Sequence, residues 1–85
     1  MEHQLYELDE IKRFYKLYKD QFRFFAVPAR SKKYHKWCLG FQCPVASGNL
    51  VNQDGDQVII KSLDLFLKYL NNHFNVELFT VVVNP

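Results

Sequence analysis

Apolar and polar residues follow two different periods along this chain, and each period predicts one type of secondary structure. Residues 7–20, ELDEIKRFYKLYKD, place apolar side chains every three or four positions, which predicts an amphipathic helix. Acidic residues in its first turn and lysines in its last turn complement the helix dipole. The predicted buried stripe contains Leu8, Ile11, Tyr15, Tyr18 and Phe22, and is widened by Phe14 and Leu17.

The next part of the chain reads as a β-hairpin. Residues 22–29, FRFFAVPA, predict a strand that is aromatic on both faces, and Pro28 marks an edge, a bulge or the end of that strand. Residues 35–42, HKWCLGFQ, alternate strictly between an apolar face and a second face. The apolar face carries Trp37, Leu39 and Phe41, and the second carries Lys36, Cys38 and Gln42. The polar segment RSKKY between the two strands has the length of a hairpin connection.

A second hairpin and a second helix follow. Residues 43–49, CPVASGN, read as irregular because proline and glycine interrupt them. LVNQDGDQVII then predicts two short strands joined by a turn at Asp54-Gly55. Ser62 is the expected N-cap of a helix that ends at a cluster of asparagines. Its predicted buried stripe contains Leu63, Phe66, Leu67, Leu70 and Phe74.

The last predicted strand, residues 76–83, is apolar on both faces. A strand of this kind at an open sheet edge invites aggregation, so we expect it inside the sheet or paired across a dimer interface. Residues 57–60, the second helix and this strand form a β-α-β unit, which favours a parallel, right-handed crossover between the two strands.

These elements predict a small two-layer α+β fold that takes up residues 1–85 as a single domain. Both helices are expected on one face of a mixed sheet, in the order α-β-β-β-β-α-β. The predicted core contains Leu8, Ile11, Tyr15, Tyr18, Trp37, Leu39, Phe41, Phe66, Leu70 and Val81.

Composition narrows the class of protein. A chain of 85 residues with 48% apolar and 16% aromatic residues is globular rather than disordered. Its apolar runs are shorter than the ~18 residues that span a bilayer. The acidic, interrupted start of the chain does not resemble a secretory signal, and two cysteines at C-x4-C spacing do not form a disulfide framework. We therefore expect a cytoplasmic protein with reduced thiols.

The residue types and their spacing give little support for a metal site or a catalytic site. A zinc site would draw on His35, Cys38 and Cys43, but the two cysteines point to opposite faces of a regular strand. No local signature joins a cysteine, a histidine and a carboxylate into a nucleophilic site, and the three glycines are isolated. We therefore predict no metal, no cofactor, no small-molecule substrate and no enzymatic activity.

Charge is distributed very unevenly along the chain. Residues 12–36 contain nine cations and one acid, a net charge of +8, whereas the rest of the chain carries −6. Like charges four apart on a helix cost a few tenths of a kcal/mol each, so helix stability alone does not favour this pattern. The predicted binding residues are Lys12, Lys16, Lys19 and Arg23, one stripe if the helix reaches Arg23, with Arg30, Lys32, Lys33, Tyr34 and Lys36 of the hairpin connection.

Two kinds of partner fit a basic surface that is interleaved with aromatic residues. The first is a protein with an acidic surface, which would make this chain an adaptor or inhibitor; a compact protein from a mobile element would fit that description. The second is nucleic acid, where cations follow the phosphates and rings stack on bases. Self-association through the last strand is a further expectation, because that strand needs cover on both faces.

Overall fold

The computed structural model describes residues 4–29 and 36–82, which contain two α-helices and six strands. The helices are α1 (Leu8–Leu17) and α2 (Leu63–Phe74), and a 3-10 turn, η1 (Lys19–Gln21), follows α1. The strands are β1 (Leu5–Glu7), β2 (Arg23–Pro28), β3 (Trp37–Cys43), β4 (Ala46–Val51), β5 (Ile59–Ile60) and β6 (Thr80–Val81).

The strands form one mixed sheet in the order β1-β4-β3-β2-β6, and β5 pairs with β3 beyond the end of β4. β2, β4 and β5 run antiparallel to β3, whereas the edge strands β1 and β6 run parallel to their neighbours β4 and β2. The predicted α+β fold with a mixed sheet is confirmed. The order of elements contains one strand more than predicted, because β1 precedes α1.

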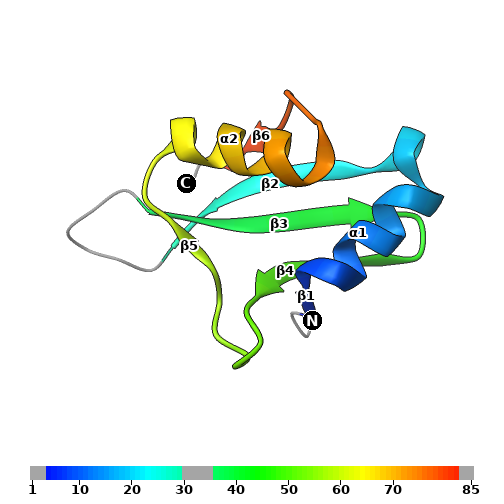
Figure 1. The fold of residues 1–85 in the computed structure, drawn as a ribbon, viewed down its shortest axis with the longest axis horizontal. Coiled ribbons are helices and arrows are strands. Elements are labelled where there is room, and N and C mark those ends of the chain that lie inside the picture. The colour runs from blue at the N-terminus through cyan, green and yellow to red at the C-terminus, as the bar shows by residue number, and fades with distance from the viewer. Residues whose placement is uncertain (1–3, 30–35, 83–85) are drawn as a thin grey trace.

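Both helices cover the same face of the sheet (Figure 1). Phe24 of β2 shows this directly, because Tyr15 of α1 and Phe74 of α2 both pack on its ring, at 5.8 and 4.7 Å between centroids. Phe41 lies opposite Phe24 in the β2–β3 register and stacks on Phe14 of α1. The molecule is therefore a two-layer α+β domain.

The core lies between the helices and this face of the sheet. Its most deeply buried large side chains are Ile11, Leu39, Leu50, Phe66 and Leu70. The predicted core members Leu8, Tyr15, Tyr18 and Trp37 are half-buried against this core, and Phe41 is buried within it. Three predicted positions were wrong: Leu17 and Leu67 are exposed on their helices, and Val81 is exposed because β6 lies at the edge of the sheet.

Helix α1 is shorter than predicted. It ends at Leu17, where the N–H of Tyr18 donates to the carbonyl oxygen of Phe14 at 2.9 Å, and the chain tightens into η1. Arg23 then opens β2. The predicted continuous helical stripe from Lys12 to Arg23 was therefore wrong, because the chain is already extended at its last member.

The segment predicted to be irregular forms a tight hairpin instead. Cys43 pairs with Ala46 across a turn, and β4 continues without interruption to Val51. Polar residues and Gly48 weaken the intrinsic strand preference of this segment, but β4 pairs with β3 on one side and β1 on the other. Tertiary pairing therefore determines the strand.

The last strand does not lie inside the sheet, so the first of its two expected positions was wrong, and pairing across a dimer interface stays a prediction. β6 is an edge strand of two residues that pairs with β2, while β3 and β2 separate it from β5. Its direction matches that of β5, since both run antiparallel to β3. The N–H of Val82 still donates to Ala26, but Pro28 has no N–H with which to extend this ladder.

The turn and cap predictions are confirmed. Gly55 has a φ of 87°, and the side chain of Asn52 accepts hydrogen bonds from the N–H groups of Asp54 and Asp56. Ser62 caps α2 by accepting from the N–H of Leu65 at 3.2 Å. Asn75 ends this helix in the left-handed conformation, with a φ of 55°.

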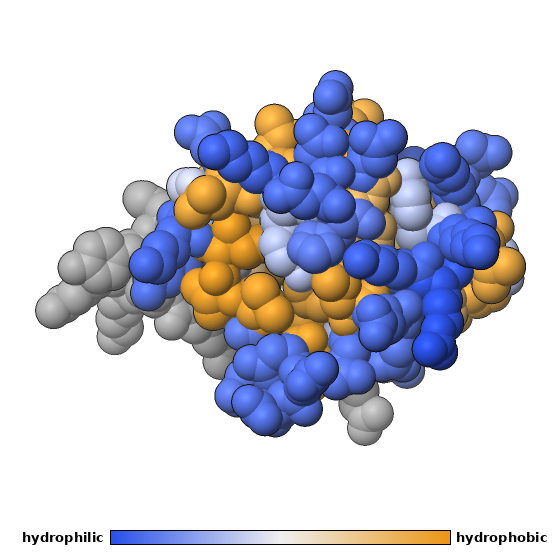
Figure 2. Space-filling model, viewed as in Figure 1, coloured by the Kyte–Doolittle hydropathy of each residue, from blue (hydrophilic) through white to orange (hydrophobic). Residues whose placement is uncertain are grey.

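The outer surface of the helix layer is mostly polar. Hydrophobic side chains reach this surface alongside β5 and the start of α2 (Figure 2). Within the described residues, neither helix has the length and apolar character needed to cross a membrane.

Candidate binding surface

A groove of about 280 Å³ opens between α1, the start of β2 and the segment that leads into β6. We call it the basic groove, because two cations, Lys19 and Arg23, lie among rings and aliphatic side chains in its wall. Its lining residues are Tyr15, Lys19, Phe22, Arg23, Phe24, Val76, Leu78, Phe79 and Thr80.

The groove exists because the chain reverses direction after α2. Asn75 adopts the left-handed conformation, and its N–H donates to the carbonyl oxygen of Asn71 at 3.0 Å. The chain then returns along the edge of β2 but pairs with it only at Phe25 and Ala26. The four residues before β6 do not pair with β2, and the half-buried ring of Phe22 remains partly accessible beside them, above the buried ring of Phe24.

The floor of the groove is a cluster of aromatic rings in mutual contact. Phe22 packs edge-to-face on Tyr15 at 5.3 Å and also contacts Phe24 at 4.9 Å. Phe24 in turn contacts Phe74 of α2 at 4.7 Å. Because these rings support one another across three elements, the floor does not need a ligand to hold its shape.

The cations at this end of the molecule are arranged around η1. Lys19 places its Nζ atom 6.0 Å from the centre of the Tyr15 ring, at the rim of the groove. Lys16 and Lys19 line a second hollow of about 400 Å³ over η1, and Arg23 also lines a third beside Gln42. Three of the predicted binding residues, Lys16, Lys19 and Arg23, therefore lie together and are exposed.

Lys12 has a different environment. It is half-buried where α1 meets α2, and its charge, together with burial, lowers the pKa of His73 from the usual 6.5, burial being the larger cause. The His73 ring also lies 4.4 Å from that of Tyr69. This cation belongs to the contact between the helices more than to the groove.

Lys36 lies at the other end of the molecule. Its carbonyl oxygen accepts from the N–H of Ala29, and this pair closes the end of the β2–β3 hairpin farthest from Arg23. The structure therefore does not bring Lys36 together with the cations of the groove. The remaining predicted binding residues, Arg30, Lys32, Lys33 and Tyr34, lie outside the described residues.

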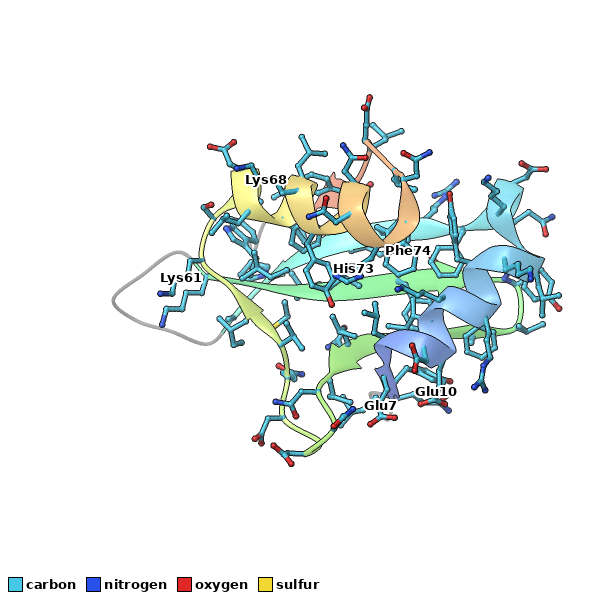
Figure 3. The ribbon with its side chains drawn as sticks, in the orientation of Figure 1. Glu7, Glu10, Lys61, Lys68, His73 and Phe74 are labelled. Carbon is cyan, nitrogen blue, oxygen red and sulfur yellow. The ribbon has the colours of Figure 1, made fainter. Side chains whose placement is uncertain are left out.

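Two cations outside the basic segment lie far from the groove. Both are exposed: Lys61 lies beside β5, at the end of the molecule opposite the carboxyl end of α1, and Lys68 lies on α2 (Figure 3). The carboxylates Glu7 and Glu10 lie at the start of α1 in the same view. The α1 helix therefore runs from an acidic to a basic part of the surface.

The two cysteines are free thiols and face opposite sides of β3. Cys43 belongs to the core cluster, whereas Cys38 lies on the other face, where its Sγ atom contacts Oε1 of Gln57 at 3.3 Å. Burial raises the pKa of the Cys38 thiol, which lowers its thiolate fraction near neutral pH. Among residues 4–29 and 36–82, no three histidine, cysteine or acidic side chains gather as metal ligands.

The charge pattern of the sequence predicts the cations of the groove but not its apolar part. Phe22 was expected in the buried stripe of the first helix, Phe24 in a strand that is aromatic on both faces, and Leu78 and Phe79 in a strand inside the sheet or across a dimer interface. One signal for the groove was present in VELFTVVV, because an apolar segment with no polar face has to leave some side chains exposed when it lies at an edge. Leu78 is 82% exposed.

Comparison of this chain with protein-family models, with curated proteins and with solved structures finds no match.

Proposed function

We propose that this protein is a non-enzymatic binding protein that recognises an acidic protein partner through the basic groove. The observation that carries the proposal is the combination of Lys19 and Arg23 with an aromatic floor and the exposed side chain of Leu78. Binding sites on proteins commonly place aromatic and arginine side chains at the centre of the contact.

The two chemistries of the groove have different roles in this proposal. The rings and Leu78 bury an apolar anchor of the partner, and this burial supplies affinity. Lys16, Lys19 and Arg23 attract carboxylates around that anchor, which accelerates association and selects an acidic partner. Around the groove the three cations Lys16, Lys19 and Arg23 outnumber the two acids Asp20 and Glu77, which favours an acidic partner.

Nucleic acid is the alternative ligand for the same cations. A ligand of this kind would need rings that are open on one face for base stacking. The rings of the groove instead pack on one another at 4.9 to 5.8 Å, which favours an apolar protein side chain above them.

The proposal is tested by capturing partners from a cell lysate with immobilised protein, with and without nuclease treatment. We expect partner proteins that remain after nuclease treatment and that the Lys19→Glu/Arg23→Glu variant does not retain. The affinity of a purified partner should fall modestly with salt, mainly because association slows.

Nucleic-acid binding would give a different result. Nuclease would remove the captured material, and affinity would fall by roughly 10³ to 10⁵ between about 50 and 200 mM salt if six to ten phosphates were contacted. That result would overturn the proposed class of partner. Capture that is lost in Lys32→Glu/Lys33→Glu/Lys36→Glu but kept in the groove variant would move the site to the hairpin connection.

A further inference from the structure

The edge of the sheet at β6 carries an unusual concentration of exposed apolar side chains. Leu78 is 82% exposed, and Val81 and Val82 are each 37% exposed, all within five residues. We call residues 78–82 the apolar edge. It contains no charged residue and no proline, the two features with which proteins usually prevent an edge strand from pairing.

The backbone of the apolar edge is also available for pairing. The N–H of Val82 donates to the carbonyl oxygen of Ala26 at 2.9 Å, so this residue faces β2. Backbone groups of successive strand residues point to opposite sides, which directs the N–H and carbonyl of Val81 away from β2. One donor and one acceptor therefore face outward at the centre of an apolar strand.

The opposite edge of the sheet is built differently. Just before β1, the carbonyl oxygen of Gln4 accepts from the N–H of Asn49 at 3.0 Å, which directs the backbone groups of Leu5 and Glu7 outward. The outward N–H of Glu7 already donates to the side chain of Glu10 at 3.2 Å. The carboxylates of Glu7 and Glu10 thus hinder the pairing of another strand with β1, whereas residues 78–82 contain no charged side chain.

We propose that the apolar edge binds a second copy of this chain, with the two β6 strands pairing antiparallel about a two-fold axis at Val81. In this arrangement each Val81 N–H donates to the Val81 carbonyl of the second copy, and both outward groups are satisfied at once. The sheets of the two copies then form one continuous sheet. The proposal does not depend on the function of the basic groove.

A second copy fits this edge because the edge is self-complementary. It is neutral and apolar, so two copies meet without charge repulsion, and pairing about Val81 sets Thr80 of each copy opposite Val82 of the other, as a two-fold interface requires. The acidic partner proposed above is attracted by cations, and residues 78–82 contain none. Phe66 of α2 packs on Phe79 at 4.7 Å, which supports the edge from the helix side.

The oligomeric state in solution tests this proposal. Light scattering and sedimentation of the wild-type protein, from about 1 to 200 µM, should show a mass that rises toward twice the 10.2 kDa of one chain. Val81→Lys places two cations at the two-fold axis and should remain monomeric. The matched control is Val45→Lys, at an exposed valine in the β3–β4 turn, and it should dimerise like wild type.

Two further measurements separate loss of pairing from loss of folding. Val81→Pro removes the outward N–H but no donor to β2, so it should be monomeric with an unchanged circular dichroism spectrum. Hydrogen exchange of the Val81 amide in wild type should become slower as concentration rises. A wild-type mass of 10.2 kDa at every concentration, or a Val81→Lys variant that dimerises normally, would overturn the proposal.

Discussion

Phe66 shows how a single side chain joins the two layers of this domain. It is fully buried, lies on the sheet side of α2, and packs on Phe79 just before β6. Phe66→Ala should therefore lower the free energy of unfolding by about 3–5 kcal/mol, the usual cost of removing a buried ring. Chemical denaturation measures this loss, and Leu65→Ala, at an exposed position of the same helix, should cost less than about 1 kcal/mol. Equal losses in the two variants would refute the assignment of the buried face of α2.

His73 makes stability depend on pH. Its pKa in the folded protein lies below 6.5, chiefly because of burial and secondly because of Lys12. The unfolded chain therefore binds more protons at this residue as pH falls below 6.5, and stability falls until the folded pKa is passed. His73→Gln should remove this loss of stability at low pH. The melting temperature of wild type, measured relative to that of the variant, should therefore be lower at about pH 5 than at pH 8. A difference that is constant over this range would contradict the lowered pKa.

At the scale of elements, Gly48 determines whether β1 can join the sheet. A Cβ atom at Gly48 would lie 2.2 Å from the carbonyl oxygen of Gln4 and 3.0 Å from the ring of Tyr6. Gly48→Ala should therefore displace β1 and cost about 1–3 kcal/mol, the usual range for overpacking. Gly40→Ala is the matched control in β3, because its nearest neighbour is a side-chain atom of Asn49 at 3.2 Å. Hydrogen exchange should show faster opening of β1 in the Gly48 variant alone, and equal effects of both substitutions would contradict this role.

Local periodicity explains which elements could be predicted from the sequence. The helices, the β2–β3 hairpin, the turn at Gly55 and the caps at Ser62 and Asn75 depend on residues that are close in sequence. The positions of β1 and β6 depend on parallel pairing with strands far away in the chain, and no local pattern specifies that pairing. The same reason limits prediction of the candidate site. The cations of the basic groove were identified from charge, whereas the groove itself joins residues 15–24 to residues 76–80.

At the scale of the whole molecule, acidic and basic side chains gather at opposite ends of α1. Glu7 and Glu10 lie at its start, and Lys16, Lys19 and Arg23 lie around its carboxyl end. Under the proposed function, this polarity would orient an approaching acidic partner toward the basic groove, where the aromatic floor would receive an apolar side chain. The apolar edge overlaps the groove, since Leu78, Phe79 and Thr80 belong to both. Self-association and partner binding would therefore use overlapping surfaces.

The affinity of matched charge variants for a purified partner tests the basic groove most directly. Lys19→Glu/Arg23→Glu and Lys61→Glu/Lys68→Glu change the net charge by the same amount, but only the first pair lines the groove. The groove variant should bind at least about tenfold more weakly, a loss of roughly 1.4 kcal/mol, while the control should bind within about twofold of wild type. Equal losses in both variants, or no loss in the groove variant, would contradict the account.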